Sequence, residues 1–208
     1  MQNIFAKVFG YDLGVNPKEY DGPMVAKTEK NGAHTGKIVN GPCPAEDGYV
    51  YQRLIDNSSD HGVTDIRCPT IFGEVDLIYL KSRPQDKRFD NLNTHVTIAK
   101  ASDLLSSEER AKIKEFCQEI KLDWGGLDIL RDKKDGRIYI VDANKTDMGP
   151  PLALSLKDKL RSTSRLAKSL RSALDRKTLE LRDSSKDPQE REIGIQTDFN
   201  QAGVKIKS

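Results

Sequence analysis

The sequence predicts an α+β fold, in which antiparallel strands form hairpins and helices pack on them. Residues 23–39, 65–81 and 126–144 each contain two apolar or β-branched segments separated by a polar turn, which is typical of paired strands. Residues 106–120 instead carry apolar side chains at helical spacing. Strands in adjacent pairs, with helices outside the pairs, indicate antiparallel sheets covered by helices.

The first part of the chain predicts one hairpin and one further strand. Residues 1–22 are rich in glycine, asparagine and proline, which favour turns. Residues 23–39 are expected to form a hairpin around a polar loop that contains Gly32 and Gly36. Residues 49–55 have the β-branched and aromatic content of a strand.

The middle of the chain predicts two strands and then a helix. Residues 65–72 and 75–81 are the two strands, and the polar stretch 82–94 is expected to be irregular. The helix begins after Ser106, because Ser106 and Glu109 have the spacing of a capping box. Apolar residues then follow at helical spacing: Ile113, Phe116, Cys117 and Ile120.

The last part predicts a hairpin, a helical region and a tail. Residues 126–131 and 137–144 are expected to pair across the turn at 132–136. Leucines recur over residues 156–174, which indicates one or two helices. Residues 183–208 are polar and charged, and a flexible tail is expected there.

The composition excludes several classes of protein. The 208 residues carry a formal charge of +2, which gives no reason to expect binding to nucleic acid or to an anionic membrane. No apolar run approaches the roughly 18 residues needed to cross a bilayer. The cysteines Cys43, Cys68 and Cys117 are odd in number and far apart, so reduced thiols in the cytoplasm are expected, and zinc is not.

The hairpin at 126–144 carries the clearest chemical pattern. Asp142 and Asn144 are two residues apart in a strand and therefore share a face. A turn near Asp135 places Asp128 roughly opposite them on the partner strand. Two carboxylates and an amide oxygen suit magnesium, which binds to carboxylates and to phosphate oxygens. The same residues also fit a surface hairpin with hydrated acids, and both interpretations remain open at this point.

The order of these residues resembles the metal-binding signature of the ATP-grasp enzymes. This family includes the D-alanine–D-alanine ligases and the enzymes that add glutamate to a ribosomal protein. The signature is an Asp on one strand followed by Glu-x-Asn on the next, so Asp142 stands in place of the usual Glu with a shorter reach. The resemblance implies that Asp128, Asp142 and Asn144 bind magnesium, two ions in the family, against the phosphates of ATP.

Two earlier segments resemble the family's nucleotide-binding parts, in the family's order. PMVAKTEKNGAHTGKIV resembles the strand, lysine and glycine loop over the phosphates, which implies roles for Lys27 and Gly32. Lys7 is the candidate for the family's first lysine. VYQRLIDN resembles the hinge that binds adenine, and it implies contacts from Gln52, Arg53, Leu54 and Ile55. Taken alone, the first segment also fits an ordinary hairpin, and the second also fits a buried strand.

Two further segments resemble the family's charged residues beside the nucleotide. TDIRCPTIFGEV resembles the segment after the hinge, which implies that Asp65 lies near the ribose and Arg67 near the phosphates. KSRPQDKRFDNLN resembles the stretch beside the reacting groups, and it implies that Arg83 or Arg88 stabilises the acyl-phosphate. A salt-bridged pair of strands is the alternative explanation of the first segment.

The resemblance also implies a domain organisation. Two lobes, each with an antiparallel sheet and helices, would enclose ATP: residues 1–60, with the glycine loop and hinge, and residues 61–182, with the metal site. Residues 183–208 would form the tail. The family's amino-terminal substrate domain is expected to be absent, and a partner chain that supplies it is one expectation.

The implied function is an ATP- and magnesium-dependent carboxylate–amine ligase that acts through an acyl-phosphate. Its substrate, a small-molecule or peptide carboxylate, cannot be named from the sequence. One alternative is a non-catalytic ATP-binding module that lacks its substrate domain. Another is an interaction protein that uses the tail and the basic segment 157–176, which also fits a hydrated helix face.

Overall fold

The computed structural model describes residues 1–29, 35–90, 92–147 and 149–184. It divides into two compact units, residues 1–167 and residues 168–208. All strands described below belong to the first unit. The second unit contains, in its described part, the remainder of the helix α4, which spans Leu156–Ser184.

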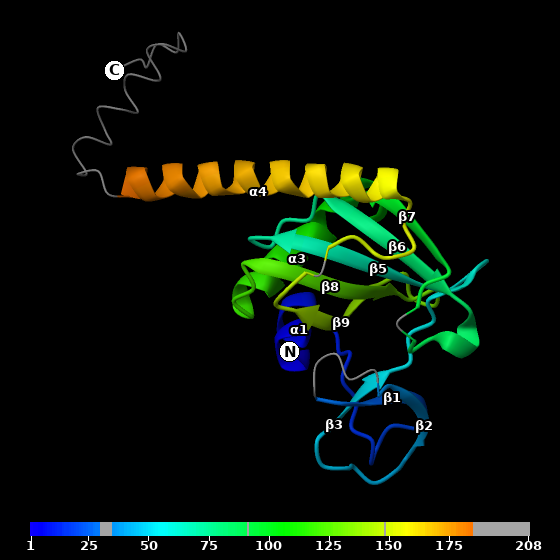
Figure 1. Cartoon of the computed structure of the whole chain (residues 1–208). Coiled ribbons are helices and arrows are strands. Elements are labelled where there is room, and N and C mark those ends of the chain that lie inside the picture. Colours follow the sequence, from blue (N-terminus) through cyan, green and yellow to red (C-terminus); the bar gives the residue numbers. More distant parts are fainter. Residues whose placement is uncertain (30–34, 91, 148, 185–208) are drawn as a thin grey trace. The chain divides into compact units, whose positions relative to one another are not determined.

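The first unit contains a small sheet of three antiparallel strands (Figure 1). Its central strand β1 (Gly22–Thr28) pairs with β2 (Lys37–Gly41) on one side and with β3 (Tyr49–Arg53) on the other. The hairpin expected at 23–39 is therefore confirmed. One face of this sheet packs around Met24 and Tyr51, which are buried.

The larger sheet holds six strands: β4 (Ser58–Ser59), β5 (Gly62–Ile71), β6 (Leu77–Arg83), β7 (His95–Lys100), β8 (Trp124–Arg131) and β9 (Ile138–Asn144). All are paired antiparallel, in the order β7-β6-β5-β8-β9 with β4 added beside β5. The pairs β5–β6 and β8–β9 are the hairpins expected from the sequence.

Helices α1 (Gln2–Phe9) and α3 (Ser107–Glu119) contact each other and share the main hydrophobic core with the larger sheet. The Ser106 side chain caps α3 by accepting from the Glu109 N–H, and Glu109 accepts from the Ser106 N–H, so the predicted capping box is confirmed. The remaining short helices are η1 (Gln85–Lys87) and α2 (Ala101–Leu104).

Several elements differ from the sequence expectation. Residues 2–9 form helix α1 where turns were expected, and strand β7 was not predicted; nor were the short elements β4, η1 and α2. The expected lobe boundaries at residues 60 and 182 stay a prediction, and residues 185–208 of the expected tail lie outside the described part of the chain. None of the described helices is both long and apolar enough to span a bilayer.

Candidate functional site

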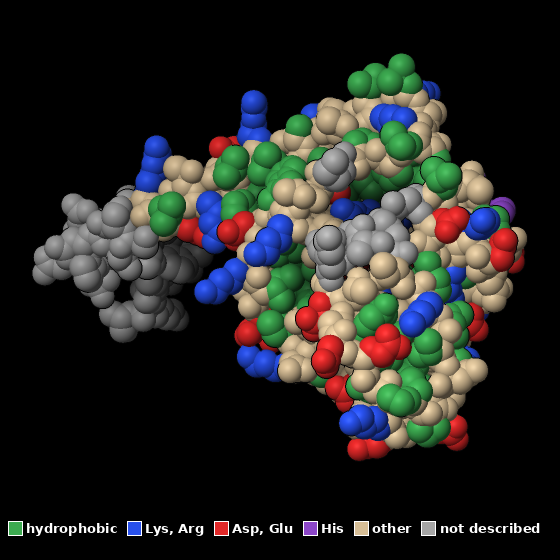
Figure 2. All heavy atoms as spheres, turned by 60° about the horizontal axis from the view of Figure 1, so that its bottom comes forward, with side chains coloured by type: hydrophobic (Ala, Val, Ile, Leu, Met, Phe, Trp, Pro, Cys, Tyr) green, Lys and Arg blue, Asp and Glu red, His purple; other side chains and the backbone are tan. Residues whose placement is uncertain are grey.

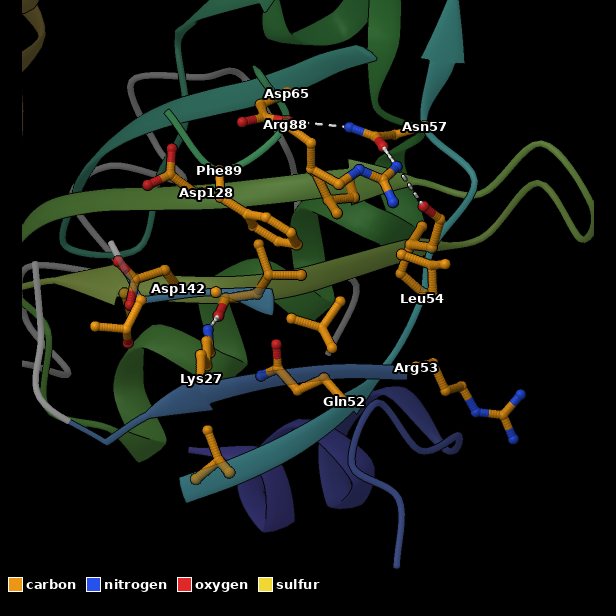
Figure 3. A pocket seen from close by; sticks show the side chains of 18 of the residues that line it. Lys27, Gln52, Arg53, Leu54, Asn57, Asp65, Arg88, Phe89, Asp128 and Asp142 are labelled. Atoms are coloured by element: carbon orange, nitrogen blue, oxygen red, sulfur yellow. Dashed lines mark hydrogen bonds between the residues drawn. The ribbon is translucent and has the colours of Figure 1, made fainter. Parts of the chain in front are cut away.

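A pocket of about 790 Å³ lies between the small sheet and the larger sheet of the first unit. Figure 3 shows its walls, with β1 and β3 on one side and the strands of the larger sheet on the other. In Figure 2 the face turned toward the reader is hollowed, and Lys or Arg side chains are visible inside the hollow. The pocket brings together most of the residues that the sequence analysis selected.

Strand alternation decides which side chains of the small sheet reach the pocket. Val25 pairs with Gln52, and Lys27 pairs with Val50, so these four side chains lie on one face. All four line the pocket. The residues between them point to the other face, where they form the small core. A single register therefore presents one ammonium, one amide and two apolar side chains to the pocket.

The Lys27 ammonium crosses the pocket to the larger sheet. Its Nζ donates to the Val141 carbonyl at 2.6 Å. Strand β9 has an irregularity beside Asp128, where Val141 is the extra residue between two ladder pairs, and such bulges turn groups away from the ladder. Burial lowers the pKa of Lys27, and the charges of Asp142 and Asp128 oppose that shift.

Asp128 and Asp142 lie directly opposite each other in the pairing of β8 with β9, as the sequence predicted. Both line the pocket. Asn144 lies two residues along the strand and donates through Nδ2 to Asp142 Oδ2 at 3.1 Å. Asp128 and Asp142 thus lie at the end of the pocket that also holds Lys27 (Figure 3). Asn144 is bonded to Asp142 but is not among the residues that line the pocket.

Asp128 has a cation on each carboxylate oxygen. Lys81 Nζ donates to Oδ1 and Arg67 Nη1 donates to Oδ2, both at 2.9 Å. Burial alone would raise the pKa of Asp128, but Lys81 and Arg67 outweigh it and hold that pKa below its ordinary value. Asp128 is therefore ionised at neutral pH. Lys81 also lines the pocket.

Arg67 lies behind Asp128 and is not among the residues that line the pocket. Its Nη2 donates to Asp147 at 3.0 Å, and the Asp147 side chain is only 5% exposed. The guanidinium also lies against the backbone of Gly126, where an added Cβ would come within 2.4 Å of Nη2. Arg67 thus orients Asp128. Asp147, which follows the predicted strand by three residues, carried no sequence signal for this contact.

The hinge segment leaves polar groups open toward the pocket. Gln52 is 3% exposed, and its Nε2 has no hydrogen-bond partner. Neither backbone group of Leu54 is hydrogen-bonded within the described residues. The Arg53 N–H, also expected to bind a ligand, instead donates to the Leu13 carbonyl, and its side chain points away from the pocket (Figure 3). Ile55 is buried at the end of this segment.

Asp65, Arg83 and Arg88 form a network next to the hinge. Arg83 donates to Asp65 at 2.5 Å and to the Arg88 carbonyl. Arg88 in turn donates to the Ile55 carbonyl at 3.1 Å and to Asn57. Burial raises the pKa of Asp65 and lowers that of Arg88. All three line the pocket. Arg88 is engaged at the hinge and Arg83 by Asp65 and the Arg88 carbonyl, and within the described residues neither arginine bonds to Asp128 or Asp142.

Phe89 adds an apolar wall that the sequence analysis missed. Its side chain lies in the pocket in Figure 3, and its ring packs against Gly36, the residue just before β2. A Cβ on Gly36 would lie 2.6 Å from the ring, so this contact requires a glycine. Phe89 was missed because it lies in the polar stretch 82–94, where no periodic apolar pattern indicates a buried side chain.

Lys7 is a described candidate that does not line the pocket. It lies on the exposed side of α1, where its ammonium pairs with Glu119 at 3.0 Å. The expectation that Lys7 contacts the ligand is therefore corrected. Gly32 lies outside the described residues.

The donor set fits a hard divalent cation. No group of three or more His, Cys, Asp or Glu side chains converges among the described residues. The proposed ligands are instead two carboxylates and one amide, which is the oxygen chemistry that magnesium accepts when phosphates complete its shell. The nearby ammonium groups of Lys27 and Lys81 suit phosphate oxygens, and the orphan Gln52 amide suits an acceptor on a ligand.

No family model and no curated protein matches this sequence. Among solved structures, the chain is similar to the ATP-grasp ligase PsnB complexed with minimal precursor, Mg and ADP, at 14% identity and a TM-score of 0.55, over 83% of this chain and 57% of that chain. PsnB with minimal precursor alone gives 15% identity, a TM-score of 0.52 and coverage of 83% and 58%. D-alanine–D-alanine ligase from Bacillus anthracis is 16% identical, with a TM-score of 0.48, over 89% of this chain and 69% of that chain. The chain thus spans a little over half the length of the PsnB chains.

Proposed function

We propose, from the ATP-grasp fold that this chain has, that it binds ATP with magnesium in the pocket between its sheets. We further propose that it is the nucleotide-binding part of a carboxylate–amine ligase. In such a reaction a carboxylate oxygen attacks the terminal phosphorus of ATP, and ADP leaves. An amine then attacks the carbonyl of the acyl-phosphate, and inorganic phosphate leaves.

The observation that supports nucleotide binding most strongly is that one pocket holds two chemically different ends. At one end lie the open backbone groups of Leu54 and the unpartnered Gln52 amide. At the other lie Lys27 and the facing pair Asp128 and Asp142. A heteroaromatic base has hydrogen-bonding edges for the first end, and a polyphosphate with cations suits the second.

The chain's residues take the following proposed roles. Leu54 and Gln52 hold the base, Lys27 binds phosphate, and Asp65 lies beside the hinge, where a ribose would follow. Asp128, Asp142 and Asn144 hold magnesium, two ions by resemblance, and Arg67 orients Asp128. Magnesium bound there would neutralise charge on the transferred phosphoryl group. Little proton transfer is required of the protein, because positioning and charge stabilisation carry phosphoryl transfer.

The acceptor substrate is a carboxylate on a small molecule or on a peptide. The structure of PsnB, one of the similar proteins, was solved with its minimal precursor bound. The three cysteines of this chain are unpaired, which supports action in a reducing compartment such as the cytoplasm.

A non-catalytic ATP-binding module is the second candidate. It is favoured by the engagement of both arginines that were expected to stabilise the acyl-phosphate. Arg83 and Arg88 are held by Asp65, Asn57 and the hinge carbonyl of Ile55. If they keep these partners when nucleotide binds, neither one reaches the transferred phosphoryl group.

Hydroxylamine trapping separates the two candidates. The full chain is incubated with ATP, magnesium, hydroxylamine and pools of small carboxylates or acidic peptides. A ligase yields ADP and a hydroxamate in equal amounts with at least one pool, and Asp142→Asn with Asn144→Ala abolishes both products. ATP that binds without ADP or hydroxamate from any pool contradicts the ligase and supports the binding module. ATP that does not bind contradicts both.

A further inference from the structure

Lys81 stands apart among the cations that line the pocket. Its Nζ bonds to Asp128 Oδ1, and Asp128 is its only hydrogen-bond or ion-pair partner among the described residues. The other cation on Asp128, Arg67, is fixed from behind by Asp147 and packs on Gly126. A lysine carries a point charge on a flexible stem, whereas this arginine is locked in place. Lys81 is therefore the partner of Asp128 that is able to move.

The two carboxylates of the acidic pair differ in their surroundings. Both oxygens of Asp128 already have a cation at 2.9 Å, and its side chain is 20% exposed. Asp142 makes no ion pair with the described residues and accepts only from the Asn144 amide. A divalent cation that approaches the pair thus meets one open carboxylate and one whose charge Lys81 and Arg67 already offset. Repulsion between Lys81 and the incoming cation opposes its binding.

A polyphosphate changes this balance. Among the described residues, five cations and five carboxylates line the pocket, so its wall favours neither a free polyanion nor a free divalent cation. A polyphosphate together with its cations is close to neutral and suits such a wall. The phosphate oxygens of the polyphosphate offer Lys81 a second set of anionic oxygen acceptors, besides the Asp128 carboxylate that it already binds.

We propose that Lys81 is an internal counter-ion of Asp128 that transfers to the phosphates when a divalent cation enters, so that cation and nucleotide bind together and neither binds well alone. The proposal rests on the proposed function, because it takes Asp128 as a ligand of the cation. It assigns Lys81 a regulatory role at that site. Exclusion of the free cation is a coupling between two ligands, and such couplings are reciprocal.

The test measures cation binding without nucleotide. Free Mn²⁺ is followed by electron paramagnetic resonance while the full-length wild type or Lys81→Met is titrated, with and without the ATP analogue AMP-PNP. Wild type is expected to bind Mn²⁺ weakly and to gain affinity when AMP-PNP is added. Lys81→Met is expected to bind Mn²⁺ alone about tenfold more tightly, and to gain less from AMP-PNP, because a repelling charge is gone.

Matched variants keep the result interpretable. Lys81→Gln keeps a hydrogen-bond donor for Asp128 without the charge, and the same gain is expected if Lys81→Met folds poorly. Asp128→Asn in the Lys81→Met background removes the gain. Lys7→Met, at a lysine paired on the surface with Glu119, leaves Mn²⁺ binding unchanged.

The outcomes also separate this proposal from the proposed function. If wild type binds Mn²⁺ with AMP-PNP but both Lys81 variants bind Mn²⁺ alone no better than wild type does, the counter-ion role is overturned and the nucleotide site stands. If AMP-PNP binds to no variant, with or without Mn²⁺, the nucleotide site is overturned and the transfer of Lys81 with it.

Discussion

Gln52 is buried in the wall of the pocket, and its amide Nε2 and the Tyr79 hydroxyl are the buried side-chain groups without a hydrogen-bond partner among the described residues. A buried donor without an acceptor destabilises a protein by about 1–3 kcal/mol. Its position opposite Val25 on the pocket face means that a ligand in the pocket is the natural source of that acceptor. Without a ligand the Gln52 Nε2 donor is unpaired, and we expect an acceptor on the ligand to pair with it.

Replacing Gln52 with Met is expected to shift stability and binding in opposite directions. Met has a similar shape and no donor, so the free energy of unfolding should rise by about 1 kcal/mol, because the unsatisfied amide is gone. The affinity for magnesium–AMP-PNP should fall about tenfold, because the ligand loses a donor. Urea unfolding and calorimetric titration measure the two quantities. A variant that loses stability and keeps its affinity would show that Gln52 is only a packing residue.

Single residues were predictable from the sequence where a family pattern fixed their type and order. Lys27, Gln52 and the Asp128–Asp142 pair all line the pocket as expected. Lys7, chosen as the family's first lysine because it precedes the glycine loop, does not line the pocket. Phe89 and Asp147 were missed for a shared reason. Their contacts are made across strands or from a loop, and no local spacing encodes such contacts.

At the scale of elements, β8 positions the acidic pair and its support. β8 pairs with β9 on one side, which sets Asp128 opposite Asp142. It pairs with β5 on the other side, which sets Asp128 opposite Arg67. Gly126, two residues before Asp128, leaves room for the Arg67 guanidinium. Strand β8 therefore carries Asp128 and the glycine on which the Arg67 guanidinium packs, and it pairs with the two strands that carry Asp142 and Arg67.

Gly126→Ala is expected to disturb this arrangement. The new Cβ would lie 2.4 Å from Arg67 Nη2, so Arg67 must leave Asp128 or Asp147. The free energy of unfolding should fall by about 1–3 kcal/mol, and Mn²⁺–AMP-PNP binding should weaken. In an Arg67→Ala background, Gly126→Ala should lower the free energy of unfolding by clearly less, because the guanidinium that clashes with the new Cβ is absent. Equal costs in the two backgrounds, by urea unfolding, would argue against the contact.

The hairpins were predictable because their signals are local. Turn residues between alternating segments specify both the strands and their register. Helix α1 has no side-chain cap and is short. It is held by Phe5, which stacks on Phe9 and packs against Phe116 and Tyr139 from distant parts of the chain. Short helices depend on such packing, so sequence alone did not indicate it. β7 similarly depends on pairing with β6.

At the scale of the molecule, the pocket exists because two sheets face each other across it. The Lys27–Val141 bond links the sheets at one end, and the Arg88–Ile55 bond links the hinge to the larger sheet's loop at the other. The ATP-grasp fold was predicted from the order of motifs over residues 23–151, but the substrate was not. The described residues that line the pocket suit the proposed nucleotide, and none of them identifies a particular carboxylate.

If the acidic pair and the nucleotide pocket form one magnesium-dependent site, calorimetric titration of AMP-PNP will show it in wild type and in Asp128→Ala/Asp142→Ala, each measured with and without magnesium. Wild type is expected to bind in a magnesium-dependent manner, and the double variant is expected to remain folded and to lose this dependence. Binding that is equally tight in both proteins, or independent of magnesium in wild type, would contradict such a site.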